Sequence, residues 1–262
     1  GKWVSPIEPR NYKVIDPSNE EPCAEISLGG KKDVDKAVSA AKKAFENWAF
    51  TTKEERLELL EKLYVIYKKR WAEMAKLITL EMGAPMKFST EMQAAAGAGH
   101  IKSFKNVLKN FNFEKDLGDE KNNQKLLYEP KGVCALITPW NWPINQVNLK
   151  VIPALASGCT VVLKPSEIAP LSSMLLAEMI DEAKFPSGVF NLLNGDGAIT
   201  GNALTSHPDI NMISFTGSTR AGALISQNAA KDFKRVSLEL GGKGANIIFK
   251  DADPEAIARG VL

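Results

Sequence analysis

The chain has few of the residues that would indicate a metal site, a disulfide framework or a membrane span. Its 262 residues include three cysteines and two histidines. The cysteines are odd in number and far apart, which fits neither a disulfide framework nor the CxxC pairs of a zinc site. His100 and His207 have no second ligand at useful spacing, so we predict no metal site and structural histidines. No apolar run approaches the length of about 18 residues that a membrane span needs, and residues 1–10 lack the order of a secretory signal.

An excess of charge of one sign is also missing. Lys and Arg total 33 against 31 Asp and Glu, so no strong field favours nucleic acid or an anionic membrane as a partner. Hydrophobic residues make up 44% of the sequence, which is ordinary for a folded globular protein. We therefore expect a small-molecule partner, and the cysteine usage favours a reducing, cytoplasmic location. Because the chain opens on Gly1 rather than Met, we expect it to have been cropped or processed.

The three cysteines could in principle supply a nucleophile. Cys134 and Cys159 lie within or beside apolar runs, where burial raises a thiol pKa and hinders access, and Cys23 lies in an early extended segment. We expect each of them to fill the core.

The first half of the chain predicts a hairpin followed by helices. Residues 12–16 and 23–28 are extended candidates separated by a turn rich in Pro, Ser and Asn. Asp33 is placed to cap the next helix, and Thr52 with Glu55 forms a capping box. The predicted helices cover residues 34–48, 71–81 and 85–110, and a further helix opens at Thr52 with an apolar stripe of Leu57, Leu60, Tyr64 and Tyr67. Gly83 and Pro85 separate the last two helices, and a polar loop covers residues 114–124.

The second half alternates short apolar runs with amphipathic ones. Strand, helix and strand repeated in this way predict a Rossmann-like α/β fold, a mostly parallel sheet with helices on both faces. The predicted strands cover residues 133–138, 160–163, 189–193, 212–215, 236–240 and 246–249, and the predicted helices cover 143–156, 171–183, 199–206 and 220–230. The predicted organisation is a hairpin over 1–32, a helical layer over 33–113, a connecting segment over 114–131 and the Rossmann-like core over 132–262.

The segment Phe215-Thr216-Gly217-Ser218-Thr219 ends a predicted strand and opens a predicted helix. The free amides and the positive dipole end of such a helix favour a phosphate site. Gly217 would let a pyrophosphate approach the backbone, and Ser218 offers a hydroxyl. Alone, the same residues favour a Gly-Ser helix cap without a ligand.

Two further segments follow predicted strands, where ligands gather in open α/β sheets. In Lys164-Pro165-Ser166-Glu167, the carboxylate can accept from ribose hydroxyls and the lysine can donate to them, although a solvated turn has the same pattern. Residues 194–201 carry three glycines without the spacing of the G-x-G-x-x-G fingerprint. Gly195 fits a plain turn, whereas Gly197 and Gly201 fit a turn and a nucleotide loop about equally.

Asn141 and Glu239 are the candidates for chemistry. Asn141 lies in the stiff loop Pro139-Trp140-Asn141-Trp142-Pro143, where a preorganised amide could stabilise a developing alkoxide by about 3–4 kcal/mol. Glu239 ends a strand before two glycines and could be a general base if it is partly buried. The alternatives are a packed aromatic-proline turn and a solvated strand-end glutamate.

Together, these segments and Glu239-Leu240-Gly241-Gly242-Lys243 resemble the aldehyde dehydrogenase superfamily in order and spacing over residues 133–253. The resemblance implies NAD(P)-dependent oxidation of an aldehyde to a carboxylic acid through a cysteine thiohemiacetal and thioester. Asn141 would form the oxyanion hole, and Glu239 would activate the deacylating water, which argues against the CoA-acylating branch. Lys150 matches a position used in some proton relays, but a surface lysine is equally consistent. Trp142 stands where phenylalanine is common.

The resemblance also implies a cofactor site. Glu167 would repel a 2'-phosphate, so NAD is preferred, although some members with a glutamate here accept NADP. The implied cofactor-binding residues are Thr138, Pro139, Trp140, Lys164, Ser166, Glu167, Gly197, Gly201, Phe215, Thr216, Gly217, Ser218, Gly222, Leu240 and Gly241.

In this family the cysteine nucleophile lies a few dozen residues beyond the Glu-Leu-Gly-Gly-Lys motif, and this chain ends at Leu262. We therefore expect the cofactor half of an enzyme, without the catalytic domain and inactive alone. Residues 121–128 resemble part of an arm that pairs with a neighbouring subunit, so we expect a homodimer or homotetramer at full length. The alternative is a nucleotide-binding or assembly module without chemistry of its own. The sequence does not identify the aldehyde.

Overall fold

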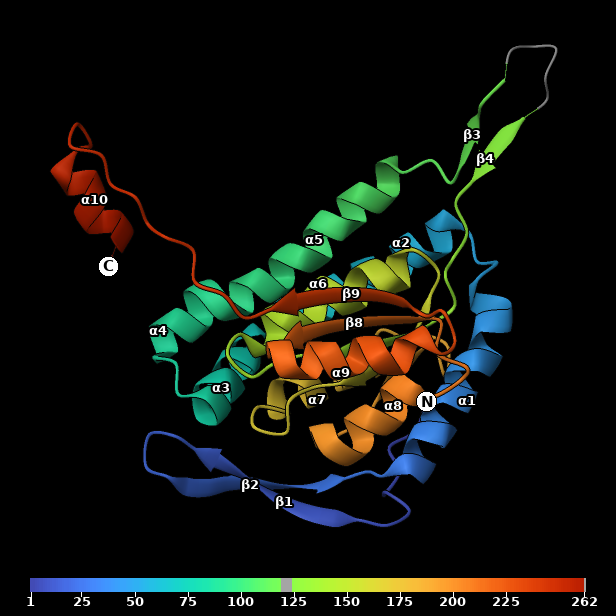
Figure 1. Cartoon of the computed structure of the whole chain (residues 1–262), viewed down its shortest axis with the longest axis horizontal. Helices are drawn as coiled ribbons and strands as arrows, with labels where there is room; N and C mark the ends of the chain where they lie inside the picture. The colour runs from blue at the N-terminus through green and yellow to red at the C-terminus, as the bar shows by residue number, and fades with distance from the viewer. Residues whose placement is uncertain (119–123, 262) are drawn as a thin grey trace.

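The centre of the molecule is a five-stranded parallel sheet with strand order β7-β6-β5-β8-β9 (Figure 1). A computed structural model describes residues 1–118 and 124–261. The strands are β5 (Val133–Ile137), β6 (Thr160–Lys164), β7 (Phe190–Leu192), β8 (Met212–Gly217) and β9 (Arg235–Leu240). The chain builds from β5 through β6 to β7 and then returns to the other side of β5, so the topological switch point lies between β5 and β8. The predicted α/β class is confirmed.

Alternating side chains of β5 serve two different cores. Cys134 and Leu136 pack against helices α2 (Lys53–Lys69), α5 (Ala94–Asn110), α6 (Pro143–Ala156) and α7 (Leu171–Glu182). Val133, Ala135 and Ile137 face the other way, toward α1 (Lys31–Trp48), α8 (Asn202–Ser206) and α9 (Thr219–Ala230). Because a strand alternates its side chains, both faces are buried and all five β5 residues can be apolar.

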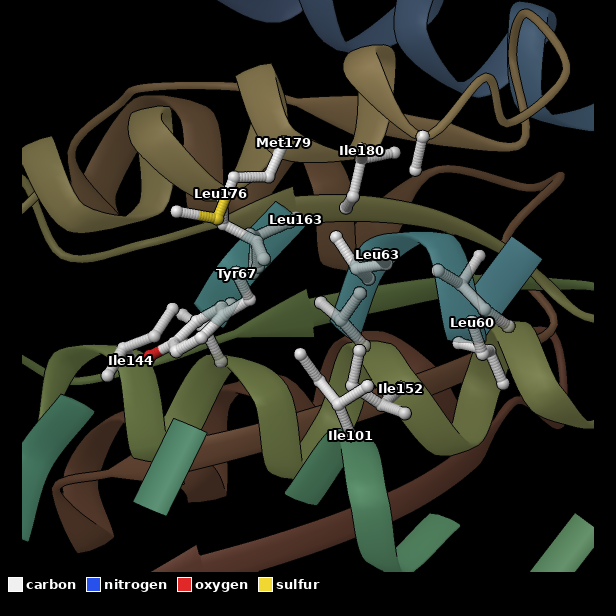
Figure 2. Packing of buried hydrophobic residues seen from close by; sticks show 14 of the residues in the cluster. Leu60, Leu63, Tyr67, Ile101, Ile144, Ile152, Leu163, Leu176, Met179 and Ile180 are labelled. Carbon is white, nitrogen blue, oxygen red and sulfur yellow. The ribbon is translucent and has the colours of Figure 1, made fainter. Parts of the chain in front are cut away.

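The larger core joins the helical layer to the sheet (Figure 2). Tyr67 of α2 lies between α6 and β6, and Leu60 and Leu63 of the same helix approach Ile101 and Ile152. The Tyr67 hydroxyl is fully buried and donates to the Ala94 carbonyl over 2.9 Å. That bond satisfies the one polar atom of the ring, so a tyrosine is accommodated among aliphatic side chains.

The capping residues decide where the helices begin and end. The predicted capping box is confirmed, because Thr52 Oγ1 accepts the Glu55 amide over 3.2 Å and Glu55 Oε2 accepts the Thr52 amide over 2.7 Å. Gly83 ends α3 (Trp71–Met82) with φ of 80°, in the left-handed region. The prediction that Asp33 is the N-cap of the first helix is wrong, because Gly30 holds that position and α1 begins at Lys31. Asp33 caps the helix from inside its first turn instead, where its Oδ2 accepts the Gly30 amide over 2.9 Å.

The predicted helix over residues 85–110 is divided in the structure. It contains α4 (Met86–Phe88), a π-helical turn (Ser89–Gln93) and α5. The predicted hairpin is confirmed as β1 (Arg10–Asp16) paired antiparallel with β2 (Glu21–Leu28).

Two strand assignments from the sequence are wrong. In the loop predicted over 114–124, β3 (Glu114–Asp116) pairs antiparallel with β4 (Lys125–Leu127), because hairpin pairing tolerates polar residues on an exposed ribbon. Residues 119–123, including part of the predicted arm, lie outside the described residues. The strand predicted over 246–249 is absent, because those residues extend away from the sheet with no strand to pair with.

After β9 the chain leaves the sheet. Residues 241–253 have no helix or strand, and α10 (Pro254–Val261) stands apart from the sheet in Figure 1. The side chains of Ile247 and Phe249 are 72% and 73% exposed. Among the described helices, none is both long enough and apolar enough to cross a membrane.

Gly188, two residues before β7, packs tightly against α1. Its φ is +86°, and a Cβ there would lie 2.6 Å from the Ala40 carbonyl oxygen, a backbone atom that cannot move aside cheaply. We expect Gly188→Ala to lower the free energy of unfolding by about 2 kcal/mol or more, as measured by urea denaturation.

Gly99, inside α5, is the matched control. A Cβ there would meet no atom within 4 Å. Gly99→Ala should therefore stabilise the chain by about 0.5–1 kcal/mol, because alanine loses less backbone entropy in a helix. Equal effects of the two substitutions would contradict this account of the packing.

Candidate functional site

The carboxyl ends of the parallel strands gather most of the candidate residues at one edge of the sheet. Ile137 at the end of β5 is in register with Lys164 on β6 and with Phe215 on β8. Farther along the same edge, Gly217 of β8 is in register with Leu240 of β9. The loop that contains Asn141 leaves β5 at this edge, so residues far apart in the sequence are collected around the switch point.

The opening of α9 has the geometry of an anion site. Ser218 is the N-cap, with extended backbone, and its Oγ accepts the Ala221 amide over 3.3 Å. Ser218, Thr219 and Arg220 are exposed, and the first amides of a helix have no intrahelical acceptor. Gly217 has a further reason to be glycine, because a Cβ there would lie 2.4 Å from the Phe215 ring.

Two buried hydroxyls at the same edge have no partner. Thr138 follows β5 directly and Thr216 lies near the end of β8, and the Oγ1 atoms of both are buried without a hydrogen bond among the described residues. An unsatisfied buried hydroxyl costs about 1–3 kcal/mol. Each of these two atoms therefore has unused hydrogen-bonding capacity at this edge.

Lys164 is buried, with its ammonium fully engaged by the protein. Its Nζ donates to the carbonyls of Pro165 over 2.9 Å and of Gly195 over 2.5 Å, and to Glu167 Oε2 over 3.3 Å. Burial lowers the pKa of Lys164, and the Glu167 carboxylate opposes this shift. Since an ammonium has three protons, Lys164 joins the end of β6 to the glycine-bearing loop, and a ribose hydroxyl would have to replace one of these acceptors.

The glycine-bearing loop is anchored from the hairpin. Asp196 forms an ion pair of 2.5 Å with Arg10 of β1, and its other oxygen accepts the Ile199 amide over 2.6 Å. Gly197 is exposed with no atom within 4 Å of a Cβ position, whereas Gly201 is buried beside the Lys164 side chain. Only the first of these two glycines therefore borders open space.

Asn141 is held on a short loop between β5 and α6. It is exposed, and Pro143 at the first position of α6 fixes where the helix begins. The Trp142 ring meets Phe88 edge-on, with 5.4 Å between ring centroids. The predicted aromatic turn therefore packs through Trp142 and leaves the amide of Asn141 accessible.

A second set of polar residues lies at this edge: Lys150, Ser214 and Glu239. Lys150 is buried on α6, and its Nζ donates to Ser214 Oγ on β8 over 3.0 Å. Burial lowers the pKa of Lys150, and the carboxylate of Glu239 raises it, so the two charges are close enough to interact. Lys150 is therefore not a surface lysine. Glu239 is exposed, so the partial burial expected for a base is missing from the described chain.

The remaining predicted positions lie along the same edge with different exposure. Gly222 of α9 allows close approach of Leu240, whose side chain would lie 2.6 Å from a Cβ at that position. Gly241 follows β9 in open space. Pro139 and Ser166 are half-buried, and Trp140 is 48% exposed.

Sequence reasoning missed Arg10 and Ser214. Two-residue alternation along β8 places Ser214 on the same face as Thr216, and this signal could have marked it. Nothing near Arg10 in the sequence indicates its contact with Asp196, 186 residues away.

The cysteines only partly behave as expected. Cys134 and Cys159 are buried, and Cys23 is half-buried. Burial raises the pKa of Cys23, and the pKa of Cys134 is also raised, chiefly by its hydrogen bond to Cys159. Cys134 and Cys159 both belong to the larger core, as expected, whereas Cys23 is only partly covered.

The fold and the edge define an α/β protein with an open parallel sheet. The model of the "Aldehyde dehydrogenase family" matches residues 3–262, and the chain belongs to this family. A 3-succinoylsemialdehyde-pyridine dehydrogenase of Pseudomonas sp. is 52% identical over 100% of this chain and 54% of its own length. The chain therefore spans about half the length of the curated relatives it matches.

Solved structures agree with this assignment. An aldehyde dehydrogenase from Bartonella henselae is 60% identical, with a TM-score of 0.96 over 99% of this chain and 55% of its own. Aldehyde dehydrogenase C from Pseudomonas syringae, in complex with NAD+ and octanal, is 46% identical, with a TM-score of 0.96 over 99% of this chain and 53% of its own.

The interaction between Lys150 and Glu239 can be tested directly. Glu239→Gln removes the negative charge that raises the pKa of Lys150, so that pKa should fall further below its ordinary value. NMR titration of the lysine side chains measures the change. Glu182→Gln, an exposed substitution at the end of α7, is the control and should leave Lys150 unchanged. An unaltered Lys150 in Glu239→Gln would show that the two groups do not interact.

Proposed function

We propose that this chain forms the NAD(P) site of an enzyme that oxidises an aldehyde to a carboxylic acid, and that it supplies the oxyanion donor and the base. The observation that carries the proposal is the collection of the α9 opening, Asn141 and Glu239 at one edge of the sheet, beside two unsatisfied hydroxyls. Membership of the aldehyde dehydrogenase family and the NAD+ bound to the Pseudomonas syringae relative support it.

The residues at this edge suit the parts of a dinucleotide. Ser218 and the first amides of α9 would hold the pyrophosphate. Glu167 would accept the ribose hydroxyls, and Gly197 would border the adenosine. Thr138 and Thr216 offer their unpaired hydroxyls. The flanking positions are Pro139, Trp140, Lys164, Ser166, Gly201, Phe215, Gly217, Gly222, Leu240 and Gly241.

When bound, the nicotinamide ring supplies a hydride acceptor for aldehyde oxidation. This chain's part is electrostatic and acid–base. The exposed Asn141 amide donates to the negative oxygen that develops on the carbonyl. Glu239 takes a proton from water during hydrolysis of the acyl group. The buried Lys150 ammonium donates to Ser214 Oγ, and the Glu239 carboxylate is near enough to raise the pKa of Lys150, so a positive charge would accompany the base.

The chain's own cysteines are poorly placed to act as the nucleophile. Cys134 and Cys159 lie toward the amino ends of β5 and β6, away from the edge that carries Asn141, and Cys23 lies in the hairpin. We therefore propose that the nucleophile of the complete reaction is not among the cysteines of this chain.

The 262-residue chain by itself should bind NAD without turning over aldehyde. Calorimetric titration with NAD measures the first property, and the appearance of reduced nicotinamide absorbance in the presence of an aldehyde measures the second. Circular dichroism first establishes that the sample is folded. Absence of binding by a folded chain would overturn the proposed site. Aldehyde oxidation by the chain alone would overturn the exclusion of its cysteines.

Preference for NAD over NADP should depend on Glu167. Glu167→Gln removes the carboxylate that repels a 2'-phosphate and weakens acceptance from the ribose, so the ratio of NADP to NAD affinity should rise about tenfold. Paired titrations with the two cofactors give the ratio. Glu182→Gln, with the same charge change on an exposed face of α7, serves as control. An equal change in the affinity ratio in both variants would mean that Glu167 does not contact the adenosine ribose.

A further inference from the structure

The N-terminal hairpin is separate from the central sheet, yet one end of it reaches the glycine-bearing loop. Among the described strands β1 and β2 pair only with each other, and Figure 1 shows them apart from the five-stranded sheet. Arg10 opens β1 and is in register with Leu28 at the end of β2. Arg10 and Gly29, the residue after β2, therefore lie close together at the end of the hairpin where the chain enters and leaves it.

Two nitrogens of the Arg10 guanidinium bind two different segments. Nη1 forms the ion pair of 2.5 Å with Asp196 Oδ2 of the glycine-bearing loop, and Nη2 donates to the Gly29 carbonyl over 2.9 Å. The planar fork of a guanidinium holds two acceptors in a fixed geometry, which an ammonium on a flexible stem does not. The side chains of Arg10 and Asp196 are 37% and 24% exposed, so water and salt screen this pair less than a fully exposed one.

The backbone of Gly29 binds the same loop at both of its ends. Its amide donates to the Asn194 carbonyl over 2.9 Å, and its carbonyl accepts the Thr200 hydroxyl over 2.6 Å. A Cβ at position 29 would lie 2.9 Å from the Leu193 side chain, so a glycine permits this approach. The hairpin thus binds the loop at its beginning, at Asp196 and at its end.

Within the loop, Asp196 connects Arg10 to the turn that contains Gly197. Asp196 is the N-cap of the π-helical turn Gly197–Gly201, and its Oδ1 accepts the Ile199 amide over 2.6 Å. Burial would raise the pKa of Asp196, but the Ile199 amide and Arg10 outweigh this effect and lower that pKa. The carboxylate is therefore charged at neutral pH, and its two oxygens bind the hairpin and the turn at the same time.

The loop needs such an anchor because it is rich in glycine. Three of the residues 194–201 are glycine, and glycine loses more backbone freedom on ordering than any other residue. Gly197, which we propose to border the adenosine, is exposed, and no atom lies within 4 Å of its Cβ position. Packing on that side therefore does not fix Gly197, and its place depends on the bonds of the neighbouring Asp196. A loop that is ordered before the ligand arrives binds that ligand at a smaller entropic cost.

We propose that Arg10 and Asp196 are positioning residues for the adenosine half of the dinucleotide, and that the N-terminal hairpin is part of the nucleotide site. The inference rests on the proposed function, because it requires Gly197 to border the adenosine. Neither Arg10 nor Asp196 needs to touch the cofactor. Arg10 holds Asp196, Asp196 holds the turn, and the turn presents Gly197 to the ligand.

The test compares the affinities of the full chain for NAD and for AMP, which carries the adenosine half of NAD, by titration calorimetry. Arg10→Gln removes the positive charge and the fork, so both affinities should fall by the same factor, about five- to tenfold. Arg10→Lys keeps the charge and should restore part of the loss, leaving a weakening of about two- to threefold. Because AMP lacks the nicotinamide half, equal factors for the two ligands would place the loss at the adenosine.

Arg70→Gln is the matched control. The Arg70 side chain is also 24% exposed and forms ion pairs of 2.7 Å with Glu73 and Glu178, neither of which belongs to the hairpin or to the glycine-bearing loop. This substitution should lower the melting temperature and leave both affinities unchanged. It therefore separates a loss of stability from a loss of positioning.

A double-variant cycle tests the connection between the two residues. Asp196→Asn removes the charge but keeps an oxygen that can accept the Ile199 amide. If Arg10 acts through Asp196, the double variant should bind NAD no more weakly than the weaker-binding of the two single variants. Should Arg10→Gln fail to fold, Arg10→Lys and Asp196→Asn decide by the same comparison.

Three outcomes would overturn the inference. The first is an unchanged NAD affinity in the folded Arg10 and Asp196 variants, and the second is a loss in the double variant equal to the product of the single losses. In both cases the unsubstituted chain binds NAD, and the proposed function stands. The third is failure of the folded, unsubstituted chain to bind NAD, which would overturn the proposed function and this inference with it.

Discussion

The buried ammonium of Lys164 is the contact on which the candidate site most depends. It joins two segments: the turn after β6, through the Pro165 carbonyl and the Glu167 carboxylate, and the glycine-bearing loop, through the Gly195 carbonyl. A cation in this position is tolerated because each of its protons has an acceptor. The loops that follow β6 and β7 are therefore held together by the buried Lys164 side chain as well as by the packing of the core.

The edge combines satisfied and unsatisfied polar groups. The ammonium of Lys164 and the carboxylate of Asp196 are fully engaged in holding the loops. The hydroxyls of Thr138 and Thr216 are buried and have no hydrogen-bond partner in the part of the chain that the structure describes. Engaged groups fix the backbone before a ligand arrives, and free groups leave hydrogen-bonding capacity for the ligand. This division is what preorganised binding requires.

Local patterns predicted the elements, and long-range contacts account for what was missed. The Thr52 and Glu55 box and the left-handed Gly83 depend on neighbours within a few residues, so the sequence was sufficient. The strand expected at residues 246–249 depends on a partner strand, which a pattern of apolar residues does not provide. Pairing also explains the opposite error at Glu114–Asp116, where a polar stretch forms a strand because Lys125–Leu127 lies beside it.

The candidate site shows the same distinction. Spacing and family resemblance placed Asn141, Ser218 and Glu239 near strand ends, as the register of the sheet has them. The contact of Lys164 with the Gly195 carbonyl could not be read from the sequence, because its acceptor lies 31 residues away and local propensity carries no information about such a contact.

The course of the chain after β9 has a consequence for handling this polypeptide. β9 is the last strand of its sheet, so one row of its backbone donors and acceptors has no neighbouring strand among the described residues. The apolar side chains of Ile247 and Phe249 follow a few residues later in open solvent. An unpaired edge strand next to exposed apolar side chains is a template for intermolecular β-pairing. We therefore expect concentrated preparations of these 262 residues to precipitate or to form larger particles unless the unpaired side of β9 is covered.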